Sequence, residues 1–315
     1  MRWRDLGGPV GRLAPGPRNA ITDVPDVRVG HAQAASGQRT GVTVVAPPAL
    51  PARAGTAVVN GVGELTAKLE IDERGVIESP VYLCGSHAVG TVFQAAVLAS
   101  GRGPDNVVLP VVGECDDGDM ADSRTVAIGD VDAALSNLGL DVAEGSVGAG
   151  TGMVLFDFPG GIGTASRAVG EHHVGVLLLC NFGDRDYLHV PGVEFGPVER
   201  RRESHGSCIA VCATDAPLSA QQLRRLALRP LLGLARIGSY ASEGSGEIAV
   251  AFSTAAGGDL PTERLDAFFA AAYEAAHESV YNCLVAARPA RRLDGGMQEG
   301  FPVEALSAPR APGPT

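Results

Sequence analysis

The segment HGSCIAVCATD, residues 205–215, constrains this chain more than any other, because it places a glycine–serine pair directly before a buried strand. From Ser207 onward, Ile209, Val211 and Ala213 alternate with small residues, which is the period-two pattern of a packed β-strand. Serine is not a preferred residue of strand interiors. The position of Ser207 therefore needs a structural or a chemical explanation.

Two interpretations of Ser207 are open from the residues alone. The ordinary one is a Gly-Ser turn that leads into the strand. The other is that the Gly206–Ser207 bond is cut, so that Ser207 carries a hydroxyl and a free α-amine. Such an amine, with a pKa of roughly 8, can accept the hydroxyl proton, as in enzymes with an N-terminal threonine nucleophile.

A second motif follows in the loop at residues 238–247, GSYASEGSGE, which leads into the apolar run IAVAF at 248–252. Ser245 and Glu247 are two residues apart, so an extended backbone would direct both side chains to one face. A carboxylate behind a hydroxyl is a usual way to orient a neighbouring amine or serine. Taken by itself the motif is a weak signal and fits a solvated loop better than a catalytic pair.

The combination of these motifs closely resembles the DmpA-type aminopeptidases, which include the L-aminopeptidase/D-amino-acid amidase-esterases and the β-peptidyl aminopeptidases. The resemblance covers most of the chain and keeps the motif order. It is carried by GSCIAVCATDAPL (206–218), GS (238–239), GSGEI (244–248) and AFST (251–254), together with NAITDVPDVRVGH (19–31), TGVT (40–43), VNGVGE (59–64), ESPV (78–81), GAGTGM (148–153), GGIGTASR (160–167) and NFG (181–183).

This resemblance implies an αββα fold, a four-layer sandwich with mixed sheets, formed by one domain over residues 1–315. It also implies a precursor that cleaves itself between Gly206 and Ser207 into an α chain, 1–206, and a β chain, 207–315. Ser207 matches the family's nucleophile, Ser245 and Glu247 match the residues that assist it, and Asn181 matches the oxyanion-stabilising asparagine. No cofactor is implied, and relatives assemble as homo-oligomers, tetramers of the α/β unit.

Those roles are physically sensible. An amide attacked by an alkoxide builds negative charge on its oxygen, and one fixed amide N–H directed at that oxygen lowers the barrier by roughly 3–4 kcal/mol. The same groups are expected to act first on the Gly206 carbonyl, through an N→O acyl shift. Gly206 has no side chain, which lets the hydroxyl approach the scissile peptide.

The segment at residues 111–122, VVGECDDGDMAD, departs from the family pattern, which has a tyrosine and a Leu-Asn-Asp run there. This chain has Asp116, Asp117 and Asp119 instead and no tyrosine. We expect Asp116 and Asp119 to bind the cationic amine of a peptide substrate. An exposed acidic loop is the alternative.

Charge and cysteine usage limit the function classes. The net charge of −11 argues against nucleic acid or an anionic membrane as partner, because no basic patch could neutralise phosphates. The N-terminus lacks the apolar core of a signal peptide, which favours a cytoplasmic protein. Six cysteines without Cys-x-x-Cys spacing predict buried free thiols. No metal site is expected, His172–His173 included, since adjacent strand residues face opposite ways.

Several elements follow from hydrophobic periodicity and capping signals. Helices are expected at 86–100, at 130–138, from a capping box at 219–222, and at about 262–286. Strands are expected at 107–112, 146–158, 163–169 and 174–182, besides the one that starts at Ser207.

The function that fits best is a self-processing aminopeptidase that releases an N-terminal residue from small peptides, amides or esters through an acyl-enzyme on Ser207. Three alternatives stay open. One is an amidase of the nylon-oligomer or pantetheine type, which usually has threonine as nucleophile. The second is an acyltransferase with an amine acceptor. The third is a non-catalytic scaffold protein, for which the divergent 111–122 segment argues. Preference for L-, D- or β-amino acids is not readable from the sequence.

Overall fold

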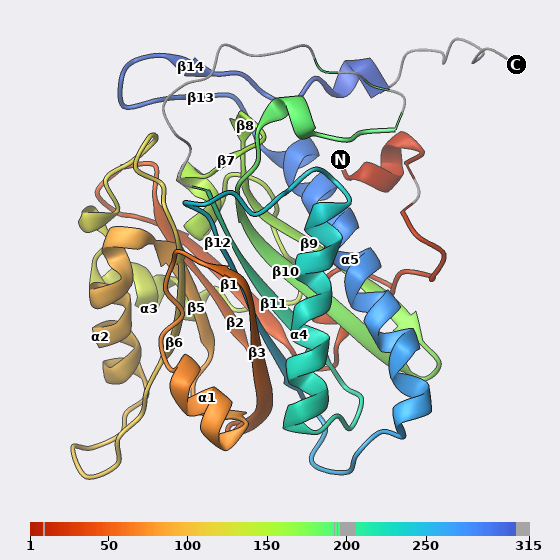
Figure 1. Ribbon diagram of the computed structural model, residues 1–315. Helices are drawn as coiled ribbons and strands as arrows, with labels where there is room; N and C mark the ends of the chain where they lie inside the picture. Colours follow the sequence, from red (N-terminus) through yellow and green to blue (C-terminus); the bar gives the residue numbers. More distant parts are fainter. Residues whose placement is uncertain (9, 192, 194, 196–205, 307–315) are drawn as a thin grey trace, which may run out of the picture.

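Two β-sheets lie face to face in the computed structural model, and helices cover their outer faces (Figure 1). The structure describes residues 1–306 apart from 9, 192, 194 and 196–205. The smaller sheet has the order β1 (Arg28–Gln33), β2 (Gly41–Ala46), β5 (Val81–Gly85), β6 (Val111–Cys115). The larger sheet has the order β4 (Val76–Ile77), β3 (Ala52–Gly61), β12 (Gly246–Ser253), β11 (Ser207–Thr214), β10 (His172–Asn181), β9 (Gly161–Val169).

The sheets are mixed, as expected. β5 pairs with β6 in parallel and β11 with β12 in parallel, whereas the other neighbours in both sheets are antiparallel. Two short hairpins lie outside these sheets, namely β7 (Val154–Leu155) with β8 (Phe158–Pro159), and β13 (Ala290–Arg291) with β14 (Met297–Gln298).

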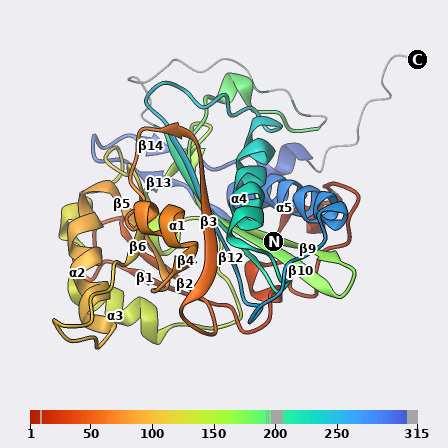
Figure 2. The same cartoon turned by 60° about the horizontal axis from the view of Figure 1, so that its bottom comes forward.

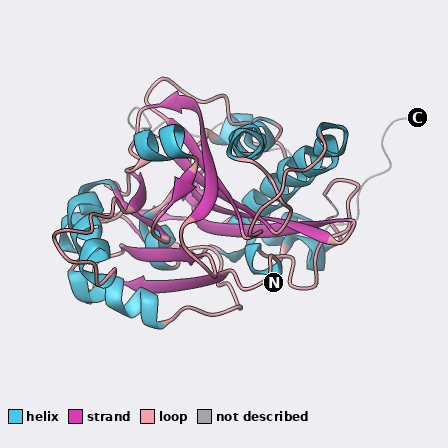
Figure 3. Ribbon diagram, turned by 90° about the horizontal axis from the view of Figure 1, so that it is seen from below, coloured by secondary structure: helices cyan, strands magenta, loops and turns pink. Residues whose placement is uncertain are grey.

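Helices form the two outer layers, which Figure 3 shows on either side of the paired sheets. The helices are α1 (Lys68–Arg74), α2 (Val89–Ala99), α3 (Ile128–Ser136), α4 (Ala220–Ala235) and α5 (Leu265–Ala286). α2 and α3 cover the smaller sheet, while α4 and α5 cover the larger one. Helix α1 lies beside β3 and β4 at the sheet edge (Figure 2). The layer order is therefore helices, sheet, sheet, helices, which confirms the αββα expectation.

Three apolar cores hold the layers together, and β11 shows why. Its odd-numbered residues Ile209 and Val211 belong to the core between the sheets, and its even-numbered residues Cys208 and Cys212 belong to the core under α4 and α5. A strand buried on both faces reads as a nearly continuous apolar run, which is the pattern of this segment. Cys208 therefore faces away from the side of Ser207, as the alternation predicts.

The helix predictions are confirmed with shifts of a few residues. A 3₁₀ turn at Ser86–Ala88 leads into α2, and another at Thr262–Arg264 leads into α5. At the start of α4, the Ser219 hydroxyl accepts from the Gln222 N–H and the Gln222 side chain accepts from the Ser219 N–H, which is the predicted capping box. Strand β6 begins at residue 111, later than expected.

The strand expected at 146–158 is wrong. A 3₁₀ helix at Gly148–Gly152 is followed by the β7–β8 hairpin. Phe156 and Asp157 adopt positive φ angles, 50° and 58°, which reverse the chain. A Cβ atom on Gly150 would come within 2.5 Å of Gly161 Cα. This close approach leaves no room for a side chain at position 150, and hydrophobic periodicity does not report it.

A buried ion cluster fixes the N-terminal segment to the helix face of the larger sheet. Arg167 on β9 is completely buried and contacts Glu274 and Glu278 of α5 at 3.2 and 2.8 Å. The completely buried Glu278 also accepts from Arg4 at 2.7 Å and from the Asn19 amide at 2.5 Å. Arg4 and Asn19 are thus docked on α5 by charge-assisted hydrogen bonds.

All six cysteines are buried and free, which confirms the sequence prediction. Within the described part of the chain, no helix combines the length and apolarity needed to cross a membrane.

Candidate active site

Ser207 is the first residue of β11, and β11 lies between β10 and β12. In the ladder it stands opposite Asn181, the last residue of β10, and opposite Gly246, the first residue of β12. Asn181, Ser207 and Gly246 therefore form one row across three neighbouring strands at one end of the larger sheet. Ser207 is buried, with 4% of its surface exposed.

The Ser207 side chain faces the smaller sheet, on the side of Ile209. There it interacts with the thiol of Cys115 at the end of β6. Burial raises the pKa of the Cys115 thiol well above its usual value, with the charge of Glu114 as a further cause. Cys115 therefore stays protonated and does not compete with the hydroxyl as a nucleophile.

Ser245 and Glu247 form the expected pair at the start of β12. The buried Ser245 hydroxyl donates to Glu247 Oε1, whereas Glu247 Oε2 is buried and has no hydrogen-bond partner among the described residues. Burial raises the pKa of the Glu247 carboxyl, and the Ser245 hydrogen bond opposes this shift. A Cβ on Gly206 would lie 3.3 Å from Ser245 Oγ, so the pair stands beside the Gly206–Ser207 peptide.

Asn181 is held on both sides of its amide group. Its Oδ1 accepts from the Val154 N–H at 2.8 Å, and its Nδ2 donates to the Asp116 carbonyl at 2.7 Å. Because Asn181 and Ser207 stand directly opposite on neighbouring strands, their side chains share one face of the sheet. The amide is thus fixed near the hydroxyl, which suits an oxyanion donor.

The two aspartates expected to bind substrate lie on the loop after β6, and both are exposed. The Asp116 carboxylate accepts from the Gly118 N–H at 2.9 Å, and Asp116 contacts Asn181 only through its backbone carbonyl. The Asp119 carbonyl accepts from the Leu293 N–H at 3.2 Å. Asp117 is buried and accepts from Thr40 at 2.7 Å. Substrate binding by Asp116 and Asp119 stays a prediction.

Glu114, which lies inside β6 and is 7% exposed, was not predicted from the sequence as a site residue. Its Oε1 accepts from the Glu64 N–H at 2.8 Å, and its Oε2 accepts from the Ser86 hydroxyl. A Cβ on Gly63 would lie 3.1 Å from this Oε1 and 3.6 Å from Gly246 Cα, so the carboxylate reaches the row that contains Ser207. The available signal was an acidic residue within the apolar run VVGEC.

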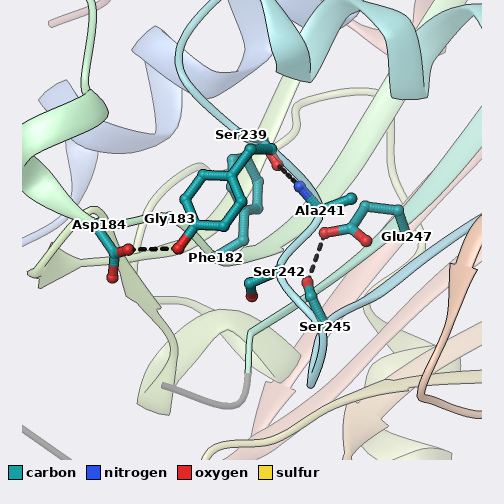
Figure 4. A pocket seen from close by; sticks show the side chains of 9 residues that line it. Phe182, Gly183, Asp184, Ser239, Ala241, Ser242, Ser245 and Glu247 are labelled. Atoms are coloured by element: carbon teal, nitrogen blue, oxygen red, sulfur yellow. Dashed lines mark hydrogen bonds between the residues drawn. The ribbon is translucent and has the colours of Figure 1, made fainter. Parts of the chain in front are cut away.

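A pocket opens beside the Ser245–Glu247 pair (Figure 4). Its opposite side is formed by Phe182, Asp184 and Tyr240, and the Tyr240 hydroxyl donates to Asp184 at 2.7 Å. Glu247 lies at the pocket wall with its unpartnered oxygen.

Comparison with known proteins agrees with this geometry. The model of a family described as peptidase family S58 matches residues 19–298. Beta-peptidyl aminopeptidase BapA of Sphingosinicella microcystinivorans is 38% identical, covering 98% of this chain and 91% of the relative. The solved structure of a Burkholderia sp. beta-aminopeptidase superposes with a TM-score of 0.88 at 38% identity over 97% of both chains.

A further solved structure is the L-aminopeptidase D-Ala-esterase/amidase of Ochrobactrum anthropi, described as a prototype for the serine aminopeptidases and a new variant among the Ntn hydrolase fold. It superposes with a TM-score of 0.86 at 34% identity, covering 97% of this chain and 96% of that one. The family model and these relatives span nearly the whole chain, and their geometry agrees with the αββα layers described above. The chain therefore belongs to peptidase family S58, the aminopeptidases that resemble DmpA and BapA, and is a hydrolase.

Proposed function

We propose that this protein cuts its own Gly206–Ser207 bond and then acts as an aminopeptidase with Ser207 as its N-terminal nucleophile. The observation that carries the proposal is the position of Ser207. Its backbone lies between β10 and β12 while its hydroxyl shares a face with the Asn181 amide. A serine needed only for strand packing would not require a fixed amide donor beside it.

Self-cleavage begins with attack of Ser207 Oγ on the Gly206 carbonyl carbon. The new C–O bond forms, the C–N bond breaks, and the hydroxyl proton ends on the nitrogen that becomes the α-amine. Water then hydrolyses this ester, which leaves a carboxylate on Gly206 and restores the hydroxyl. The α-amine then takes the proton of Oγ when Ser207 attacks a substrate carbonyl.

Glu247 and Ser245 orient this α-amine. The Ser245 hydroxyl donates to one carboxylate oxygen, and the other oxygen is unpartnered among the described residues. An ammonium group that forms beside Gly206 supplies a donor for that oxygen. Asn181 donates to the oxyanion that forms on the substrate carbonyl, a contribution of roughly 3–4 kcal/mol to the barrier.

Glu114 binds the amino group of the substrate. Its carboxylate is buried. Among the residues that the structure describes, its hydrogen-bond partners are a backbone N–H and a hydroxyl, and no cation lowers its pKa. Burial raises the pKa of Glu114, and an ammonium ion would reverse that effect by pairing with the charged form. The exposed Asp116 and Asp119 then attract the cation at longer range.

The substrate is a small peptide, amide or ester with a free amino terminus. The relatives named for β-peptidyl substrates support β-amino acid residues as one class that the site accepts. By the same analogy we propose a homo-oligomer.

The proposal is tested by assaying aminoacyl p-nitroanilides of the L-α, D-α and β-amino acid series with purified protein. We expect release of p-nitroaniline from at least one series, and loss of at least about 10⁴-fold in kcat/KM for Ser207→Ala. An acceptor amine added to the same assay separates hydrolysis from acyl transfer. Turnover by the Ser207→Ala protein at the normal rate would show that the nucleophile is wrongly assigned.

A further inference from the structure

The carbonyl oxygen of Gly206 already has a hydrogen-bond donor in the continuous chain. The backbone N–H of Gly246 donates to it with an N···O distance of 3.2 Å. This bond is the first rung of the parallel β11–β12 ladder, because Ser207 stands opposite Gly246 and a residue in a parallel ladder bonds to the residues flanking its partner. The peptide that precedes Ser207 therefore lies in the plane of the sheet, with its oxygen toward β12.

Asn181 lies on the other side of this peptide. It belongs to β10, whereas the Gly206 oxygen is directed toward β12, and β11 separates the two strands. The Asn181 amide also donates to the Asp116 carbonyl at 2.7 Å. This arrangement differs from the expectation that the same groups serve both the self-cleavage and the substrate reaction.

The Ser207 hydroxyl leaves the sheet on the face shared with Ile209, at right angles to the in-plane carbonyl. Attack from that face pushes negative charge onto the Gly206 oxygen while the oxygen stays against the Gly246 N–H. A donor that is in place before the reaction needs no reorganisation when the charge forms, which is the condition for effective oxyanion stabilisation.

The absence of a side chain at position 246 is what allows this close contact. A Cβ atom there would lie 2.5 Å from the Val62 carbonyl oxygen and 3.2 Å from Gly63 Cα. The turn after β3 thus packs against Gly246 and holds its N–H in register with Gly206. A larger residue would push the start of β12 away from the scissile peptide.

We propose that the backbone N–H of Gly246 is the oxyanion donor for self-cleavage, and that Asn181 serves only the later reaction with substrate. The inference rests on the proposed cleavage at Gly206–Ser207. In this step the Oγ–C bond forms, the charge resides on the Gly206 oxygen next to the Gly246 N–H, and collapse of the intermediate breaks the C–N bond as nitrogen takes the hydroxyl proton.

The test removes one hydrogen without changing the side chain. Glycolic acid introduced at position 246 by nonsense suppression replaces the N–H with an ester oxygen. The matched control carries the hydroxy acid of isoleucine at Ile248, two residues along, whose N–H points to the same neighbouring strand. Splitting is followed by intact mass from the time of purification.

We expect the 246 ester to split about 10²-fold or more slowly than the wild type, and the 248 ester to split at nearly the wild-type rate. Equal splitting by the 246 ester and the wild type overturns the inference and leaves the proposed function intact. A wild-type chain that never splits would instead overturn the proposed function.

Asn181→Ala provides a second test that does not depend on the folding of the ester proteins. We expect this variant to split within about threefold of the wild-type rate, while kcat/KM of the resulting enzyme falls about 10²-fold or more. A folded Asn181→Ala protein, judged by its circular dichroism and melting temperature, that stays a single chain would contradict the division of roles.

Discussion

Two buried glutamates, Glu278 and Glu247, differ in the charge of the groups that contact them. Glu278 is completely buried in α5 and is contacted by Arg167, Arg4 and the Asn19 amide. Glu247 is 2% exposed at the start of β12, has a serine as its hydrogen-bond partner, and leaves one oxygen unpartnered among the described residues.

The difference distinguishes a carboxylate that stabilises the fold, Glu278, from one that we expect to act in the reaction, Glu247. A buried charge is costly unless it is paired, so a fold that retains Glu278 surrounds it with cations. No cation among the described residues pairs with Glu247, and burial raises its pKa. Self-cleavage would place an ammonium group beside it. The pairing that is missing from Glu247 is therefore expected to be made by the reaction.

The largest effect is expected at the paired site. Glu278→Gln leaves Arg167 with one carboxylate in place of two and removes the charge that binds Arg4. We expect the free energy of unfolding to fall by about 3–5 kcal/mol, the usual cost of breaking a buried ion pair. Urea denaturation measures it. Chains that remain folded should split and turn over substrate normally. A loss of turnover in a folded Glu278→Gln protein would contradict the purely structural role of Glu278.

Glu247→Gln should show the reverse pattern. We expect kcat to fall by about 10²–10³-fold, because the amide cannot hold the α-ammonium of Ser207 by charge. With Ser207→Ala in both proteins, the chain stays uncleaved and no ammonium forms beside Glu247. In that background Glu247→Gln should change the free energy of unfolding by less than about 1 kcal/mol. Steady-state kinetics of the Glu247→Gln enzyme and urea denaturation of the uncleaved pair give the two numbers. A stability loss as large as that of Glu278→Gln would assign Glu247 a structural role.

Glu114→Gln extends the comparison to a third buried carboxylate and tests whether Glu114 binds the amino group of the substrate. We expect KM to rise about 10–100-fold with kcat changed much less, because the lost contact is to the substrate's ammonium and is present before and during the reaction. The matched control is an N-acetylated substrate, which lacks the ammonium. If the variant discriminates between free and acetylated substrates as strongly as the wild type, Glu114 does not bind the amino group.

The smallest effect is a pH dependence of stability. Burial raises the pKa of Glu247 in the folded chain above its ordinary value of 4.5, so the folded chain holds this proton more tightly than the unfolded one. Stability from this group is present below that value and is lost as pH rises through the raised pKa. With Ser207→Ala in both proteins, so that the chain stays uncleaved, the protein with Glu247 should lose stability relative to the one with Glu247→Gln as pH rises above 4.5. Melting temperatures across that range test the sign.

Much of the fold follows from local patterns. The alternation along β11 and the capping box at Ser219 both depend on neighbouring residues, and both predictions are confirmed. The strand expected at 146–158 failed because the chain reverses at Phe156 and Asp157, where the Phe156 N–H donates to the Phe182 carbonyl at 2.8 Å, a contact with a residue distant in sequence that no local pattern reports. Periodicity predicts which face is buried and does not predict where the chain reverses.

The site residues also divide into those that local sequence patterns predict and those that depend on tertiary packing. Ser207, Ser245 and Glu247 were predicted from their motifs and from the family resemblance, and Asn181 from the resemblance alone. The structure brings these four residues together at one end of the larger sheet. Glu114 was missed because its proximity to Ser207 depends on how the second sheet packs on the first. Substrate binding by Asp116 and Asp119 was predicted from their charge. Charge alone does not predict whether a carboxylate is buried, and both residues are exposed.

The central claim is that one hydroxyl becomes a nucleophile by acquiring the amine of its own residue. Intact mass with N-terminal sequencing of the purified, active protein tests this most directly. The account predicts two chains, residues 1–206 and 207–315, with serine at the second N-terminus, and a single chain for Ser207→Ala. An active preparation in which Gly206 and Ser207 are still joined would contradict it.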